Sequence, residues 1–356
     1  MNEWASALGT TSGRGLSPSF LNALEALASS SEGEWWHDVL AHRDVFIAVR
    51  RESINVYHRG ASIFQVNFEN GKLVPVTHAK YLVRQQQAYA RLREDGAFSA
   101  DAAATLWPRY EGPTTLQEML RAAAALAGPE KIGLHSLLMN SPHVVDVEIA
   151  LDGLAGGMAI ESIAPGVSSF AEENGERAEI AEAIEAASAV AIAPTRRIDR
   201  LDVATVEERN GALALVFHEA KHFANKELRA AANRLPPVLE QMERYEATLR
   251  LHEQRLLSEY SAVCRSLVAI DAMRQAISAR SGSPTASALS PRTHRVAGGE
   301  PLKLDPHPRL VLFGFDEDQK NGTVWAKHRD RLQEVLGPDR IYAVGNTRAK
   351  SSAAFR

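Results

Sequence analysis

The sequence predicts an α/β protein with a mixed sheet in its larger, later part, preceded by a smaller, mainly antiparallel β region. Three features of the pattern predict this class. Alternating apolar runs separated by turns fill residues 45–78, and a strand–turn–strand pattern covers residues 197–223. Near the C-terminal end, two buried-strand runs flank a helical stretch. Helical patterns join these parts, as an α/β architecture requires.

Length and composition set the scale of the fold. A chain of 356 residues exceeds the usual size of one compact domain, so we predict two. The boundary is placed between an accessory domain of residues 1–109 and a main domain of residues 110–356. Hydrophobic residues make up 45% of the chain and charged residues 24%, which is typical of a globular protein and excludes a largely disordered one.

The first domain begins with four runs of alternating residues between positions 45 and 78. Short turn signals separate them, and the Asn-Gly pair at residues 70–71 is the clearest hairpin turn. These features predict an antiparallel meander. Spacings near three and four residues then predict helices from residue 80 to residue 127, broken around Pro108 and Pro113.

The main domain opens with an alternating strand pattern at residues 144–151. Residues 171–188 are rich in glutamate and alanine and predict an exposed helix. Two strands are then predicted at residues 197–207 and 212–223, with a turn at Asn210-Gly211 between them.

After these strands, Pro236-Pro237 predicts the start of a long helix whose apolar pattern continues to Leu267. Composition predicts a mobile loop at residues 279–300. The segment 310–344 reads as strand, helix and strand, which is a βαβ-like ending. The last ten residues are expected to form a disordered tail.

A carboxylate and an ammonium group share one face of the strand at residues 213–223. Because side chains alternate along a strand, Glu219 and Lys221 follow the apolar Phe217 on the same side. Buried charges are costly unless they are paired or bind a metal. An acid-x-Lys motif alone is a weak signal, because two ordinary surface charges at a strand end would give the same pattern.

Other residues in a fixed order strengthen the motif. Asp199 lies twenty residues upstream of Glu219, and Gln241 and Tyr245 lie downstream, four apart on one helix face. This series resembles the PD-(D/E)xK nucleases, particularly the RecB-like branch. The resemblance covers about residues 195–250 and implies a restriction-endonuclease-like αβββαβ core with a mixed sheet.

The resemblance also implies chemical roles. Asp199, Glu219 and the backbone carbonyl of Ala220 would bind Mg²⁺ or Mn²⁺, which prefer hard oxygen ligands. Lys221 would orient or activate the attacking water, while the glutamine and tyrosine of the helix would line the cleft. The implied activity is metal-dependent hydrolysis of phosphodiester bonds.

Two acids of this assignment have competitors. Asp202 competes with Asp199, because residues three apart on a regular strand point to opposite faces and only one can meet Glu219. The resemblance implies Asp199, since the family places its ligand at the first Asp of such a stretch. The family often adds an acid from the preceding helix, and Glu118 is the candidate in this chain. Asp146 and Glu148, which are expected to share one face of the strand that follows, are alternatives.

The expected partner is nucleic acid. The resemblance to the nuclease family favours DNA over RNA. A net charge of −4 argues against a globally basic binder but permits a local basic cleft. Arg197 and Arg200 flank the first acid, and Lys226 and Arg229 follow the acid-x-Lys motif. Phage defence, restriction and repair are the cellular roles that such a nuclease suggests. Endonuclease or exonuclease action, a homodimer and a partner defence protein all stay open.

Two other readings are weighed against the nuclease. His218, Glu219 and His222 match H-E-x-x-H, a zinc-peptidase signature that requires a helix. The apolar run before them predicts a strand, where the two histidines lie too far apart to bind one ion. The third reading is an inactive nuclease fold that binds nucleic acid or a protein.

The chain carries no apolar run of the roughly 18 residues that a membrane helix needs, and no signal-peptide pattern at its start. We therefore expect a cytoplasmic protein. The single cysteine, Cys264, cannot form an internal disulfide, which agrees with a reducing compartment.

Overall fold

The structure is a computed structural model of the chain. It describes residues 13–30, 34–78, 81–82, 89–98, 109–152, 198–231, 234–281, 289–345 and 355. The predicted helix at residues 171–188 lies outside the described residues.

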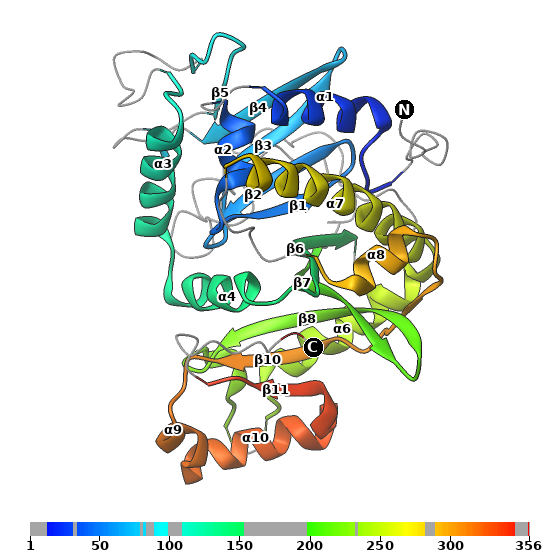
Figure 1. Cartoon of the computed structure of the whole chain (residues 1–356). Coiled ribbons are helices and arrows are strands. Elements are labelled where there is room, and N and C mark those ends of the chain that lie inside the picture. The colour runs from blue at the N-terminus through cyan, green and yellow to red at the C-terminus, as the bar shows by residue number, and fades with distance from the viewer. Residues whose placement is uncertain are drawn as a thin grey trace, which may run out of the picture.

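An antiparallel sheet of five strands forms the first part of the fold, in the order β1-β2-β3-β4-β5 (Figure 1). Its strands are β1 (Phe46–Val49), β2 (Ser53–His58), β3 (Ala61–Glu69), β4 (Lys72–His78) and β5 (Tyr89–Arg91). The predicted meander and the Asn70-Gly71 turn are confirmed, since both turn residues have positive φ, at 53° and 79°. The prediction of helix throughout residues 80–127 is wrong at β5, which pairs with β4.

A second, mixed sheet forms the later part, in the order β11-β10-β8-β7-β6, with β9 beside β8. Its strands are β6 (Val144–Asp152), β7 (Ile198–Arg209), β8 (Ala212–His222), β9 (Leu302–Leu304), β10 (Arg309–Phe313) and β11 (Ile341–Ala343). Strands β6, β7 and β8 are antiparallel neighbours, whereas β10 runs parallel to both β8 and β11. The predicted α/β class and mixed sheet, the strand–turn–strand unit and the βαβ ending are confirmed.

Helices cover both sheets and connect them. They are α1 (Pro18–Ala28), α2 (Trp35–Ala41), α3 (Pro113–Leu126), α4 (Pro129–Met139), α6 (Pro237–Leu251), α7 (Glu253–Ser281), α8 (Pro291–Ala297), α9 (Glu317–Asn321) and α10 (Thr323–Leu336). Five of them, including α4 and α6, have proline in the first turn, where its missing N–H costs nothing. Figure 1 shows α7 crossing in front of the first sheet, with α9 and α10 beyond the far edge of the second.

Three predicted segments differ from the structure. The predicted long helix is two helices, because the chain turns at His252 between α6 and α7. The predicted mobile loop at 279–300 contains the end of α7 and the helix α8, which Ser290 caps; residues 282–288 lie outside the described residues. In the predicted disordered tail, Phe355 is fully buried against the ring of His218.

The largest hydrophobic cluster takes side chains from both predicted domains. It runs from Leu16 near the start of the described chain to Leu302 in β9, and includes residues of β1–β3, β6–β8 and α7. The predicted boundary between residues 109 and 110 stays a prediction. Residues on both sides of it contribute to this one hydrophobic cluster.

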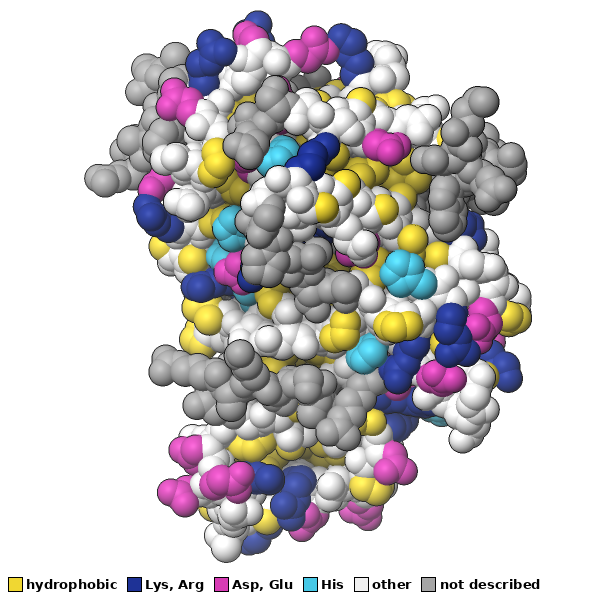
Figure 2. Space-filling view, viewed as in Figure 1, with side chains coloured by type: hydrophobic (Ala, Val, Ile, Leu, Met, Phe, Trp, Pro, Cys, Tyr) yellow, Lys and Arg dark blue, Asp and Glu magenta, His cyan; other side chains and the backbone are white. Residues whose placement is uncertain are grey.

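Charges of both signs are interspersed over the face shown in Figure 2, with one group of Lys and Arg side chains at its lower right edge. None of the helices in the described segments is long and apolar enough to cross a membrane.

Candidate active site

The candidate site lies where β7 and β8 stop pairing. Their ladder runs from the Arg209–Ala212 pair at the turn to the Val203–His218 pair. Beyond it, the N–H of Ala220 donates to the carboxylate Oδ2 of Asp202 at 2.8 Å. At the point where the two strands separate, the Asp202 side chain accepts the backbone hydrogen bond that β7 no longer accepts. This contact places Asp202 near Glu219 on β8.

Glu219 and Lys221 form the centre of the site. Alternation along β8 places them on the same side, as predicted, and Lys221 Nζ lies 2.8 Å from Glu219 Oε1. Glu227, from the short 3₁₀ turn Lys226–Leu228, lies 2.6 Å from the same ammonium group. Glu219 and Lys221 are both buried, while Glu227 is half exposed. The lysine therefore bridges a buried carboxylate and one at the surface.

Helix α6 contributes the two predicted residues that lie four apart. Gln241 Nε2 donates to Glu219 Oε1 at 3.0 Å and lies 2.5 Å from the Tyr245 hydroxyl. That hydroxyl donates to the backbone carbonyl of Arg200 on β7. The predicted grouping of Gln241 and Tyr245 with Glu219 is thus present in the structure.

The geometry favours Asp202 over Asp199 as the acid that works with Glu219. Asp202 accepts the N–H of Ala220, the residue after Glu219, and its charge contributes to raising the pKa of Glu219. Asp199 lies three residues further along β7 and accepts a hydrogen bond from Thr248 Oγ1 of α6 at 2.7 Å. The sequence contained both aspartates, but the contacts that distinguish them join residues distant in the chain.

A third acid lies in the same row. On β6, Glu148 falls between Val147 and Ile149, whose partners on β7 flank Asp202. Its φ of +52° marks a local departure from regular strand geometry. Glu148, Asp202 and Glu219 thus follow one another across three neighbouring strands.

The other acids that were considered lie elsewhere. Glu118 sits on α3 and pairs with Arg121 of the same helix. Asp146 is fully buried and pairs with Arg14 and Arg50. The expectation that Asp146 and Glu148 share a face is wrong: Glu148 pairs instead with Lys131, and its φ of +52° interrupts the regular alternation of the strand.

Sequence reasoning missed an acid at the start of α4. Glu130 Oε2 accepts hydrogen bonds from the backbone N–H of His222 at 3.0 Å and from Asn225 Nδ2 at 3.1 Å. Its charge also contributes to raising the pKa of Glu219. Pro129, which starts α4, was the available signal, because the resemblance implies an acid on the helix before the first strand of the core.

The predicted nucleic-acid contacts divide into three kinds. Lys226 and Arg200 are exposed. Arg229 instead packs over the rings of Phe223 and Trp325 and donates to backbone carbonyls, so it holds the structure together. Arg197 lies outside the described residues.

The zinc-peptidase reading fails on local geometry. His218 and His222 lie on strand β8, not on a helix, so they do not form the pair of ligands that H-E-x-x-H requires. Burial lowers the pKa of His218 to about 3, and its ring contacts Thr205 at 2.9 Å.

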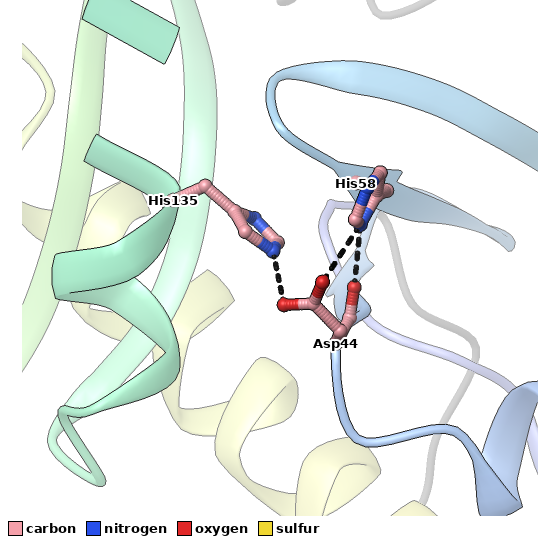
Figure 3. Close-up of side chains that lie close together, drawn as sticks. All are labelled: Asp44, His58 and His135. Atoms are coloured by element: carbon pink, nitrogen blue, oxygen red, sulfur yellow. Dashed lines mark hydrogen bonds and ion pairs between the residues drawn. The ribbon is translucent and has the colours of Figure 1, made fainter. Parts of the chain in front are cut away.

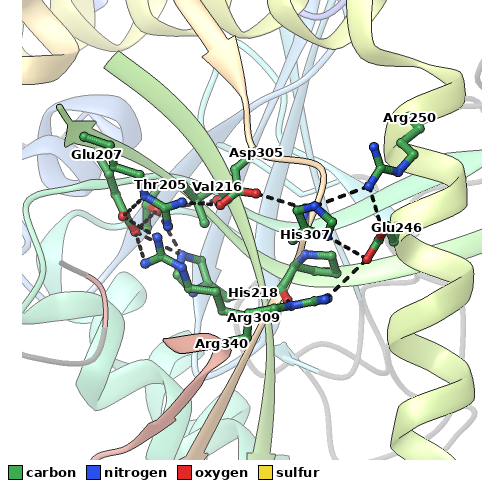
Figure 4. Close-up of polar contacts among 12 residues, drawn as sticks. Thr205, Glu207, Val216, His218, Glu246, Arg250, Asp305, His307, Arg309 and Arg340 are labelled. Carbon is green, nitrogen blue, oxygen red and sulfur yellow. Dashed lines mark hydrogen bonds and ion pairs between the residues drawn. The ribbon is translucent and has the colours of Figure 1, made fainter. Parts of the chain in front are cut away.

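His218 instead lies beside an ion-pair network that joins β7, β8 and β10 (Figure 4). Arg309 of β10 binds both carboxylate oxygens of Glu207 at 2.7 Å, and both side chains are buried. A bidentate pair of this kind is directional as well as strong. The network therefore fixes the strands behind the site.

The charges of the site are arranged so that both central acids resist ionisation. Burial raises the pKa of Glu219, and the nearby charge of Asp202 raises it further, against the opposing effect of Lys221. Burial also raises the pKa of Asp202, although Lys131 opposes this. For Lys221, the surrounding carboxylates outweigh burial and hold its pKa above the ordinary value.

One atom of the site is suited to a cation. Glu219 Oε2 is buried and has no hydrogen-bond partner among the described residues, whereas Oε1 accepts from Gln241. A buried, unsatisfied carboxylate oxygen beside a second carboxylate fits a hard cation such as Mg²⁺. The carbonyl of Ala220, between Glu219 and Lys221, stays a predicted ligand.

No protein-family model, no curated protein and no solved structure matches the chain.

Proposed function

We propose that this chain is a metal-dependent nuclease that hydrolyses phosphodiester bonds, with DNA as its substrate. One observation carries the proposal: two carboxyl groups with raised pKa, Asp202 and Glu219, meet at the parting of β7 and β8 beside the buried ammonium of Lys221. Buried like charges are costly to keep unless they serve chemistry or bind a cation. The sequence resemblance to PD-(D/E)xK nucleases supports the same reading, and it alone supports DNA and a role in phage defence, restriction or repair.

The residues of the candidate site have separate roles in the proposed reaction. Asp202 and Glu219 would hold Mg²⁺ or Mn²⁺, and when bound the metal would acidify water and offset charge on the phosphate. Lys221 has a raised pKa and stays protonated at neutral pH, so it serves as a cation beside the phosphate and not as the base. Gln241 orients the Glu219 carboxylate through Oε1.

Incubation of the purified protein with supercoiled and linear DNA, in Mg²⁺, Mn²⁺ or EDTA, tests the proposal. We expect cleavage with either metal and none in EDTA. Glu219→Gln and Lys221→Met should lower the rate by at least about a hundredfold, because each removes a charge beside the reacting phosphate.

The matched control is Glu118→Gln, a glutamate on α3 whose partner is Arg121 of the same helix. It should cleave like the wild type. Absence of cleavage in every metal, or equal activity of Glu219→Gln and wild type, would refute the proposed function. Nicking of the circles would show endonuclease action.

A further inference from the structure

The turn between β2 and β3 of the first sheet contacts helix α4, which packs against β8 of the second sheet. Gly60, in this turn, has a φ of +77°, and a Cβ added to it would lie 2.8 Å from Cδ and 3.2 Å from Cβ of Lys131. The N–H of the preceding residue, Arg59, donates to Nδ1 of His135 at 3.1 Å. The first sheet therefore touches α4 at two residues, four apart on one helix face.

A cluster of Asp44, His58 and His135 strengthens this contact (Figure 3). Asp44, just before β1, lies between the two buried imidazole rings. His135 Nε2 lies 2.8 Å from Asp44 Oδ1, and His58 Nδ1 lies 2.7 Å from the Asp44 carbonyl oxygen. The cluster joins β2, the start of β1 and α4.

The backbone fixes how these imidazoles are protonated. Because His135 Nδ1 accepts the Arg59 N–H, its Nε2 carries the proton and donates to Asp44. His58 Nδ1 faces a carbonyl oxygen, which only accepts, so it too carries a proton. The three side chains have ligand atoms within 4.8 Å of one another, but the ring nitrogens that face Asp44 are donors. In this arrangement the cluster is a hydrogen-bonded clamp between β2, the start of β1 and α4.

Lys131, which contacts the Gly60 turn, also contacts two acids of the candidate active site. Its Nζ lies 2.6 Å from Glu148 Oε1 and 3.9 Å from Asp202 Oδ1. The three side chains are 24%, 21% and 19% exposed, so water screens their interaction only in part. They also line one small hollow together with Gly60 and His135.

We propose that Lys131 is a positioning residue for Asp202, and that the Gly60 turn of the first sheet sets the position of Lys131. Lys131 neutralises Glu148, so that Asp202 keeps its place against the Ala220 N–H instead of being repelled by a neighbouring charge. The first sheet is thus a working part of the nuclease site. This inference rests on the proposed function.

The first experiment compares Lys131→Met with Lys131→Arg. Loss of Lys131 should displace Asp202, a proposed metal ligand, and so weaken Mn²⁺ binding, measured by calorimetry, by roughly tenfold. Loss of positioning should lower the cleavage rate at saturating Mn²⁺ by at least about tenfold. Arginine keeps the charge and should restore both quantities toward wild type.

The second experiment uses two glycines in equivalent turns of the first sheet. Gly60 and Gly71 have φ values of +77° and +79°, but a Cβ at Gly71 would meet nothing within 4 Å. Alanine at either position therefore introduces the same backbone strain, which thermal melting should show. Only Gly60→Ala should also lower the cleavage rate at saturating Mn²⁺.

The outcomes separate the two proposals. If wild type binds Mn²⁺ and cleaves DNA, but Lys131→Met matches wild type in both Mn²⁺ affinity and cleavage rate, Lys131 has no positioning role. If Gly60→Ala and Gly71→Ala lose the same amount of activity, the turn does not set the site. If wild type neither binds Mn²⁺ nor cleaves, the nuclease proposal itself is wrong and this inference falls with it.

Discussion

At the scale of single residues, the site depends on which of two aspartates meets Glu219. Asp199 and Asp202 are three apart on β7, and their surroundings differ. Asp202 accepts the Ala220 N–H and raises the pKa of Glu219. Asp199 accepts from Thr248 and lies 4.0 Å from Arg244, both on α6. The first environment suits a metal ligand and the second a structural anchor.

Paired amide variants test this difference. Asp202→Asn should abolish cleavage, because it removes a ligand charge while keeping the shape of the side chain. Asp199→Asn should keep most of the activity per folded molecule and lower the melting temperature, because a buried charged contact is weakened. Both quantities are measured on one preparation of each variant. An inactive but stable Asp199→Asn together with an active Asp202→Asn would restore the assignment that the sequence suggested.

At the scale of elements, helix α6 holds β7 and β8 together at the site. Gln241, Tyr245 and Thr248 lie at intervals of four and three residues, so they share one helix face. They bond to Glu219, to the carbonyl of Arg200 and to Asp199, respectively. The helix therefore fixes the distance between two strands that no longer pair with each other.

Substitutions on α6 should separate orientation from anchoring. Gln241→Ala removes a neutral hydrogen bond of about 0.5–1.5 kcal/mol, so cleavage should fall by a few-fold to tenfold, less than in Lys221→Ala. Tyr245→Phe removes the bond to Arg200 and should mainly lower the melting temperature. Cleavage rates per folded molecule and thermal melts of the three variants check this order. A stable, fully active Gln241→Ala would show that the glutamine does not orient Glu219.

The sequence predicted those elements whose signals are local. Alternation on β8 placed Glu219 and Lys221 together, and proline marked the start of α6. Spacing of four paired Gln241 with Tyr245. The sequence analysis did not single out Glu130, because this residue reaches the end of β8 through a contact between residues 92 positions apart. The sequence also did not predict the break between α6 and α7, because the apolar pattern continues across it.

At the scale of the whole molecule, a buried charge network joins segments far apart in the chain. Asp146 of β6 is fully buried. It accepts hydrogen bonds from Arg14 at 2.8 Å, Arg50 at 2.5 Å and the Tyr260 hydroxyl at 2.9 Å. These partners come from the start of the described chain, the end of β1 and α7. Together with the shared core, the network ties both sheets into one cooperative structure.

Unfolding should therefore be a single transition, despite the boundary that the sequence predicts at residue 109. Asp146→Ala leaves Arg14 and Arg50 buried without their shared carboxylate, which typically costs about 3–5 kcal/mol. Calorimetry should show the one transition of the wild type moved to lower temperature in the variant. Lys72→Ala, which removes an ion pair whose side chains are 68% and 78% exposed, should change it little. Two separate transitions in the wild type, with only one of them shifted by Asp146→Ala, would show that the sheets unfold as independent domains.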